Sequence, residues 1–262
     1  MSNNTYNVPG RFGNILILNI LCSRLAKKYD LKINYKWLQQ TNDLGLDLYT
    51  QGTRVFDRDM LFEDDDFERF IENEELHSNI IIRKHHQTPS CAHQIKKYIQ
   101  TPEIRQSIIS HNCFKERYDN NNDVYVHVRL DDIIRFNPGY EYYDGVLSRL
   151  SFENGFISSD TIDHPICKQL IEKYKLTIVD YSDNDAFIYE KTSHIDPTYN
   201  EILTLMFAST CKYIVCSGGT FSWMIGILSS VASTPSNVYY HSSNRGSPWF
   251  GDIFVFDEWN MI

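Results

Sequence analysis

Along this chain, segments with helical spacing of apolar residues take turns with segments that have strand spacing. Residues 15–29 place apolar side chains on one helical stripe, with Asn14 positioned to cap the helix and Lys27 and Lys28 suited to its carboxyl end. Residues 31–35 alternate apolar and polar side chains, as a strand does. Such alternation of helices and strands is typical of an α/β protein with mostly parallel sheets.

The same alternation resumes after the polar run 119–123, which is the best candidate for a linker. Beyond it, the spacing predicts strands at 124–129, 155–158, 176–180 and 213–216, and helices at 164–174, 201–211 and 221–230. The sequence therefore predicts two Rossmann-like α/β units, residues 1–118 and 119–262, with the largest cleft between them.

Composition narrows the classes of function. The chain has 262 residues, and its 42% of hydrophobic residues suffices for a packed core. The 34 acidic residues exceed the 25 basic ones, and the resulting formal charge of −9 argues against a protein that binds many phosphates of a nucleic acid. A single phosphorylated metabolite needs only one or two well-placed cations, so that class of ligand stays open.

The spacing of possible metal ligands predicts no metal centre, and the lengths of the apolar stretches predict no membrane anchor. The six cysteines lack metal-ligand spacing and are expected to be reduced thiols in the core. The acidic run 64–66 is interpreted as a solvated loop leading into a helix, and His85 and His86 as polar residues of the surface or of a cleft. The apolar stretch 15–22 is too short to span a bilayer, and the polar start does not resemble a secretory signal. A cytoplasmic protein is expected.

Three segments place unusual residues where α/β sheets bind ligands, at junctions of strands with helices or loops. In the first, Gly10-Arg11-Phe12-Gly13-Asn14, two glycines three positions apart precede the first helix. They let a ligand approach the backbone, next to the free N–H groups of a helix amino end. A tight turn that requires positive φ explains the glycines equally well.

The second segment runs from Val124 to Asp132. On a strand, His127 and Arg129 share one face, so an imidazole and a guanidinium emerge together at the carboxyl edge of the sheet. The planar guanidinium offers paired donors to phosphate oxygens, which suits a nucleoside diphosphate. The alternative is a local ion pair of Arg129 with Asp131 or Asp132.

The third segment leads an apolar strand through Ser217-Gly218-Gly219-Thr220 into a helix that carries Phe221 and Ser222. This turn aims backbone N–H groups and hydroxyls at one point, which is the geometry of an anion cradle. It lacks the lysine of a Walker loop, so a mononucleotide kinase or an ATPase is not expected. The alternative is a simple helix cap, with Trp223 in the core.

Taken in order, the three segments resemble the GDP-fucose-dependent fucosyltransferases, above all the alpha-1,2 family. They are more distantly similar to the alpha-1,6 and protein O-fucosyltransferases, and more closely to relatives in large DNA viruses, whose site of action would be the host cytoplasm. The likeness extends from about residue 10 to residue 230 in order and spacing. The pattern His127-x-Arg129-x-x-Asp132 and the run Thr220 to Trp223 are its most specific parts.

The resemblance implies a GT-B fold, in which two Rossmann-like domains face one another. The second domain would hold a nucleotide-sugar donor, and the first would approach a glycan acceptor. The implied reaction inverts the anomeric centre and needs no divalent metal or other cofactor. As the bond to the sugar breaks, negative charge grows on the leaving diphosphate, and fixed cations and N–H groups stabilise it.

The resemblance also implies roles for single residues. Arg129 matches the arginine that grips the donor β-phosphate, and His127 matches the residue beside the nucleotide. Arg11 and Asn14 would face the sugar and the acceptor across the cleft. The other matched positions would contribute to donor binding: Gly10, Gly13, Ser217, Gly219, Thr220, Phe221 and Ser222.

Departures from the family pattern bear on the identity of the donor. Leu130 stands where many members have a second arginine, and the paired acids after the next strand are reduced to Ser159-Asp160. Thr204 stands at the position of the acid that recognises guanine, and Glu201, one turn earlier, is the candidate substitute. GDP-fucose is the expected donor, and a UDP-sugar such as UDP-xylose is the alternative.

The sequence leaves the general base open. Asp132 is the first candidate because it lies within the motif, and Asp131 and Glu141 follow. A cluster of tyrosines just past the motif is interpreted as domain-interface packing, with sugar stacking as the alternative: Tyr140, Tyr142 and Tyr143. A non-catalytic carbohydrate-binding protein that kept the fold is the alternative from another class of function.

Overall fold

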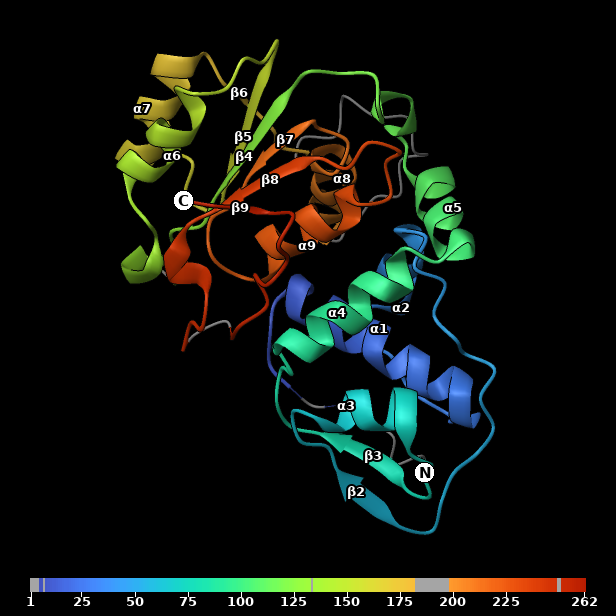
Figure 1. The fold of residues 1–262 in the computed structure, drawn as a ribbon. Helices are drawn as coiled ribbons and strands as arrows, with labels where there is room; N and C mark the ends of the chain where they lie inside the picture. The colour runs from blue at the N-terminus through green and yellow to red at the C-terminus, as the bar shows by residue number, and fades with distance from the viewer. Residues whose placement is uncertain (1–4, 7, 133, 182–197, 249–250) are drawn as a thin grey trace, which may run out of the picture.

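The computed structural model describes residues 5–6, 8–132, 134–181, 198–248 and 251–262, and its strands form two parallel sheets (Figure 1). The smaller sheet has the order β1-β3-β2 and comprises β1 (Thr5–Tyr6), β2 (Asp59–Leu61) and β3 (Asn79–Ile82). The larger sheet comprises β4 (Val124–Val128), β5 (Gly155–Ser159), β6 (Thr177–Ile178), β7 (Tyr213–Val215), β8 (Asn237–Tyr240) and β9 (Asn260–Met261). The predicted α/β class with mostly parallel sheets is confirmed.

The strand order of the larger sheet is Rossmann-like. Its order is β6-β5-β4-β7-β8-β9, and all of these neighbours pair in parallel. The order reverses between β4 and β7, and ligands of such sheets bind outside the carboxyl ends of the strands at this switch point. The second motif contains β4 and the third follows β7, so the topology itself brings them together.

Helices cover both faces of the larger sheet (Figure 1). On one face lie α6 (Tyr140–Leu147) and α7 (Pro165–Tyr174), and on the other α8 (Thr198–Ala208) and α9 (Thr220–Ser229). Strand β4 is buried along its whole length, with its valines packed among residues of α6 and α7 and Tyr125 in the core that contains α8 and α9. This double burial explains why the strand is apolar at almost every position.

We call the described residues up to 118 the first half of the chain and those from 119 to 262 the second half. The remaining helices belong to the first half. Its helices are α1 (Phe12–Tyr29), α2 (Leu38–Asp43), α3 (Asp66–Glu68), α4 (Pro89–Ile99) and α5 (Pro102–His111), with a π-helical turn at Arg69–Asn73. Short 3₁₀ turns lie at Lys115–Arg117, Ile134–Phe136 and Ser242–Asn244. Helices α1 and α4 lie between α9 and the smaller sheet (Figure 1).

One hydrophobic core joins the two halves. It runs without interruption from Leu18 and Leu21 of α1 to Met224 and Ile225 of α9, all of which are fully buried. The division into domains at residue 118 stays a prediction. Among the helices in the described ranges, none combines the length and the apolar character that crossing a membrane requires.

Three local predictions are wrong. Residues 31–35 form no strand, and Leu31 makes only an isolated bridge to Arg54. Asn14 lies inside the first turn of α1, whose N-cap residue is Arg11. The acidic run is not fully solvated, because Asp66 is buried and its Oδ2 accepts a hydrogen bond from the backbone N of Glu63 at 2.7 Å.

The cysteines are all free, and five of them are buried. Cys113 is exposed, which corrects its expected place in the core.

Candidate functional site

A cavity of about 630 Å³ lies between the two halves. This volume is typical of sites for small molecules. The wall from the first half consists of Pro9 to Asn14 with His85 and Gln87. The wall from the second half consists of residues at or after the carboxyl ends of β4, β5 and β6, residues of α8, and the turn 218–221.

The amino ends of α1 and α9 meet at this cavity. Gly13 lies so close to α9 that a Cβ at this position would be 2.8 Å from both the backbone N of Phe221 and Oγ1 of Thr220. Asn14 Oδ1 accepts hydrogen bonds from Thr220 Oγ1 at 2.6 Å and from Gln87 Nε2 at 2.9 Å. The first N–H groups of a helix have no acceptor within it and carry partial positive charge. Two helix ends therefore offer donors to one cavity, which suits an anion.

The turn into α9 requires a glycine. Gly219, the N-cap residue of α9, has a φ of +96°, a conformation that residues with a Cβ rarely adopt. It allows Gly218, Gly219 and Thr220 to line the cavity in succession. The third motif is thus both a turn that needs glycine and part of the cavity wall.

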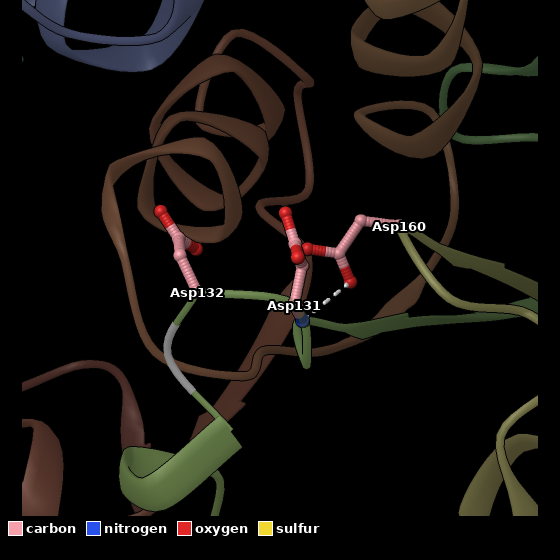
Figure 2. A group of neighbouring side chains, drawn as sticks. All are labelled: Asp131, Asp132 and Asp160. Atoms are coloured by element: carbon pink, nitrogen blue, oxygen red, sulfur yellow. Dashed lines mark hydrogen bonds between the residues drawn. The ribbon is translucent and has the colours of Figure 1, made fainter.

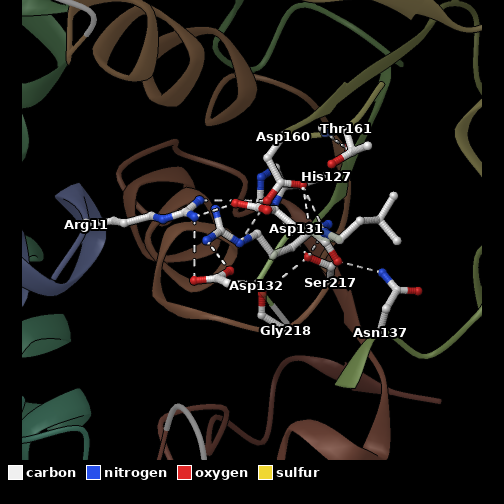
Figure 3. A network of polar contacts seen from close by, with 12 residues as sticks. Arg11, His127, Asp131, Asp132, Asn137, Asp160, Thr161, Ser217 and Gly218 are labelled. Atoms are coloured by element: carbon white, nitrogen blue, oxygen red, sulfur yellow. Dashed lines mark hydrogen bonds and ion pairs between the residues drawn. The ribbon is translucent and has the colours of Figure 1, made fainter. Parts of the chain in front are cut away.

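His127 extends from β4 toward α9 and is only 6% exposed (Figure 3). Its Nδ1 lies 2.5 Å from Oγ of Ser222 and 3.4 Å from Oγ of Ser217, and its ring packs against Phe221. Ser217 Oγ also accepts a hydrogen bond from the backbone N of Arg129 at 3.1 Å. Burial, together with the charge of Arg129, lowers the pKa of His127 to about 3. The imidazole is therefore neutral near pH 7.

This buried histidine should make the folded state less stable in acid. A histidine of the unfolded chain has a pKa of about 6.5, so the unfolded chain binds more protons than the folded one between that pH and about 3. The free energy of unfolding should consequently fall by about 1.4 kcal/mol for each unit that the pH drops below about 6.5. Burial also lowers the pKa of His86, which adds to the effect.

Urea denaturation at about pH 7 and at about pH 5 measures this dependence. In a His127→Asn variant, the free energy of unfolding should fall less steeply with decreasing pH, by about 1.4 kcal/mol per pH unit. Equal slopes in the two proteins would contradict the assignment.

Arg129 follows β4 and lines the cavity, with its side chain 16% exposed. Its Nη2 donates to Asp132 at 2.6 Å, so the local ion pair that the sequence offered as the alternative is present. Its Nε pairs with Asp160 at 3.1 Å. Within the described ranges its Nη1 has no partner, so two N–H groups of the guanidinium are left for a ligand. The ion pairs orient Arg129 without using up its donors.

Three carboxylates gather beside Arg129, those of Asp131, Asp132 and Asp160 (Figure 2). One oxygen from each lies within 4.8 Å of the others, a spacing that could hold a metal ion. Arg11 reaches this cluster from the first half (Figure 3), with its Nη2 2.7 Å from Asp131 and 3.5 Å from Asp132 and its Nη1 3.8 Å from Asp160. Two guanidinium groups therefore balance most of the negative charge.

The carboxylates of this cluster have structural partners. Asp160 Oδ1 accepts hydrogen bonds from the backbone N of Leu130 at 2.9 Å and of Asp131 at 3.4 Å, which holds the loop after β4. Partial burial raises the pKa of Asp132, but the hydrogen bond and charge of Arg129 and the charge of Arg11 outweigh it, so this pKa lies below its usual range. A carboxylate of lowered pKa is a poor proton acceptor. The geometry thus favours an orienting role for Asp132 over that of a base.

The opposite wall is formed by the end of β6 and by α8. Glu201, Thr204 and Asn200 line the cavity there, next to the aliphatic side chains of Ile178 and Val179. Apolar walls with a few polar groups are typical of pockets for small molecules and cofactors. Both residues considered for base recognition therefore line the cavity.

No protein-family model matches the chain, and no curated protein matches it significantly. The likeness to fucosyltransferases therefore rests on the three motifs themselves.

Most of the site residues expected from the sequence line this one cavity. They are Gly10, Arg11, Gly13, Asn14, His127, Arg129, Asp132, Asp160, Glu201, Gly219, Thr220 and Phe221. Ser217 and Ser222, which were expected to face the ligand, are fully buried behind the cavity wall and hold His127.

Other candidates lie elsewhere. Glu141 is exposed and outside the cavity wall. Tyr142 and Tyr143 of α6 are buried in the core of the second half, so they do not pack between the halves. His86 is buried, whereas His85 lines the cavity.

The motifs did not reveal His85 and Gln87 as parts of the wall. They directly precede Thr88-Pro89, where Thr88 Oγ1 accepts a hydrogen bond from the backbone N of Cys91 and caps α4. A threonine followed by proline is a recognisable helix start. That signal would have marked residues 85–87 as another strand-to-helix junction.

Proposed function

We propose that this chain transfers a sugar from a nucleoside diphosphate donor, GDP-fucose, to a hydroxyl group of a glycan acceptor. The reaction would invert the anomeric centre and would need no metal. One observation carries the proposal: the guanidinium of Arg129 and the amino end of α9 line the same cavity at the switch point between β4 and β7. The likeness of the motifs to fucosyltransferases supports the choice of reaction.

The diphosphate would lie between α9 and Arg129. The N–H groups of the first turn of α9 and Nη1 of Arg129 would stabilise the charge that grows on it as the bond to the sugar breaks. Leu130 is buried and carries no charge, whereas Arg11 brings a second guanidinium from the first half. The cavity therefore has two guanidinium groups despite the missing second arginine of the motif, and both also pair with the carboxylates beside Arg129.

The acceptor would approach from the first half. Each half has its own parallel sheet, and the cavity lies between them, which supports a GT-B arrangement. On this assignment the wall made by Pro9 to Asn14 and His85 faces the acceptor, and the wall made by β6 and α8 holds the base.

Thermal-shift measurements with GDP, UDP, GDP-fucose and UDP-xylose test the proposal. A ligand at about a hundred times its Kd stabilises the folded state by about 2.7 kcal/mol, which corresponds to a rise in Tm of roughly 5–10 °C at this chain length. A shift with GDP and GDP-fucose is expected. A shift with UDP alone would keep the enzyme but reject fucose, and no shift with any nucleotide would favour a non-catalytic carbohydrate-binding protein.

Replacing Glu201 with glutamine should weaken GDP binding about tenfold or more and leave UDP binding nearly unchanged. Guanine presents two adjacent N–H donors, which a carboxylate accepts together, and such a bidentate pair contributes about 1–3 kcal/mol. Uracil has one such donor. Titration calorimetry with both nucleotides measures the difference, with the exposed Glu172→Gln on α7 as the control. Unchanged GDP affinity would place the base elsewhere.

A further inference from the structure

His85 is a cavity residue that the motifs leave without a role. It follows β3 and precedes α4, and it lines the cavity next to Pro9 and Gly10. It is partly exposed, unlike its buried neighbour His86. It therefore stands on the wall of the first half, where the proposed function puts the acceptor.

The hydrogen bonding of His85 determines which ring nitrogen can take up a proton. Its Nε2 lies 2.5 Å from the carbonyl oxygen of Pro9. A carbonyl oxygen only accepts, so Nε2 carries the hydrogen and donates it. In the neutral ring Nδ1 then has a lone pair. This Nδ1 has no partner among the residues that the structure describes, and it is open to solvent.

Among the residues that the structure describes, the other titratable groups of the cavity near Arg129 already have partners or other uses. Asp132 and Asp160 pair with Arg129, and Arg11 lies near both. His127 uses Nδ1 in its contact with Ser222, and its pKa is lowered to about 3, so it is a weak base. Glu201 lies on α8, on the wall assigned to the nucleotide base. His85 is thus the group on the acceptor wall that has an imidazole lone pair to offer.

We propose that His85 is the general base of the reaction, which rests on the proposed function. The acceptor oxygen forms a bond to the anomeric carbon while the bond between that carbon and the β-phosphate oxygen breaks. The electron pair of the broken bond leaves with the nucleoside diphosphate. The acceptor proton passes to Nδ1 of His85, and Nε2 keeps its hydrogen bond to Pro9, which stabilises the imidazolium. His85 then releases the proton to solvent.

The full chain with a His85→Gln substitution tests this role. The glutamine amide can still donate to the Pro9 carbonyl, so the segment should keep its conformation, but it cannot accept a proton. GDP release from GDP-fucose is measured with water as the acceptor. We expect kcat to fall by about 10²–10⁴-fold, with KM for GDP-fucose changed by less than about threefold. The Tm shift caused by GDP should be unchanged.

Two companion variants sharpen the result. His77→Gln, at an exposed position just before β3, should turn over GDP-fucose as the original protein does. His85→Ala should lose turnover and regain part of it when free imidazole is added, which a merely structural role would not produce. Normal kcat in His85→Gln, or equal loss of GDP binding and kcat, would overturn the role of His85. Absence of any nucleotide shift in the original protein would instead overturn the proposed function.

Discussion

Replacing Arg129 with alanine should reduce both GDP binding and turnover by about 10²–10³-fold. Its guanidinium lines the cavity, and Nη1 has no hydrogen-bond partner among the described residues. Alanine therefore removes two N–H donors that would bind the diphosphate. The fold should persist, because Asp132 and Asp160 would still have a cationic partner in Arg11, whose guanidinium nitrogens lie 3.5 and 3.8 Å from their carboxylate oxygens. Titration calorimetry with GDP and a denaturation curve separate the loss of binding from a loss of stability.

Lysine at position 129 should restore only part of the affinity. An ammonium group supplies charge, but it lacks the planar set of donors with which a guanidinium can bind two carboxylates and a phosphate at once. Arg149→Ala is the matched control, because Arg149 is exposed after α6 and away from the cavity. Near-normal GDP affinity in Arg129→Ala would remove Arg129 from the donor site.

Replacing Gly13 with alanine should lower the free energy of unfolding by about 1–3 kcal/mol. The new Cβ would lie 2.8 Å from the backbone N of Phe221 and 2.9 Å from the backbone C of Thr220, distances that force α1 and α9 apart. Backbone atoms of a helix cannot yield as a flexible side chain can. The same displacement would widen the place where both helix ends face the cavity, so GDP affinity should fall as well.

Gly145→Ala is the matched control for this effect. Gly145 lies in α6, and a Cβ there would meet no atom within 4 Å. Because alanine is the better helix former, this variant should be more stable by up to about 1 kcal/mol. Denaturant titration of both variants measures the two changes. A Gly13→Ala protein as stable as the original would show that α1 and α9 can separate at no cost.

Local patterns predicted the second half well because they act over a few residues. The period of two along β4 put His127 and Arg129 on one side of a strand, and apolar runs before and after Gly218 and Gly219 placed β7 and α9 within a residue or two. Chain connectivity with parallel strands then forces the ends of β4 and β7 to the same edge.

Several of the predictions that failed concern residues whose partners are distant in sequence. Asn14 was expected to cap α1, yet its Oδ1 is used by Thr220, more than two hundred residues later. Ser217 and Ser222 were expected to face the ligand, but they bind His127 from behind. Hydroxyl and amide side chains serve caps, ligands or core contacts equally well, and only their neighbours in space decide between these uses.

The α/β class, the parallel strands and the set of cavity motifs were thus determined by the sequence, because periodicity, glycine and helix starts act locally. Tertiary structure alone decided that Arg11 meets Asp131 across the cavity and that His85 donates to Pro9. Both contacts depend on how closely α1 packs against α9 and β3 against β1, since the directions of these side chains follow from backbone positions that no short stretch of sequence specifies.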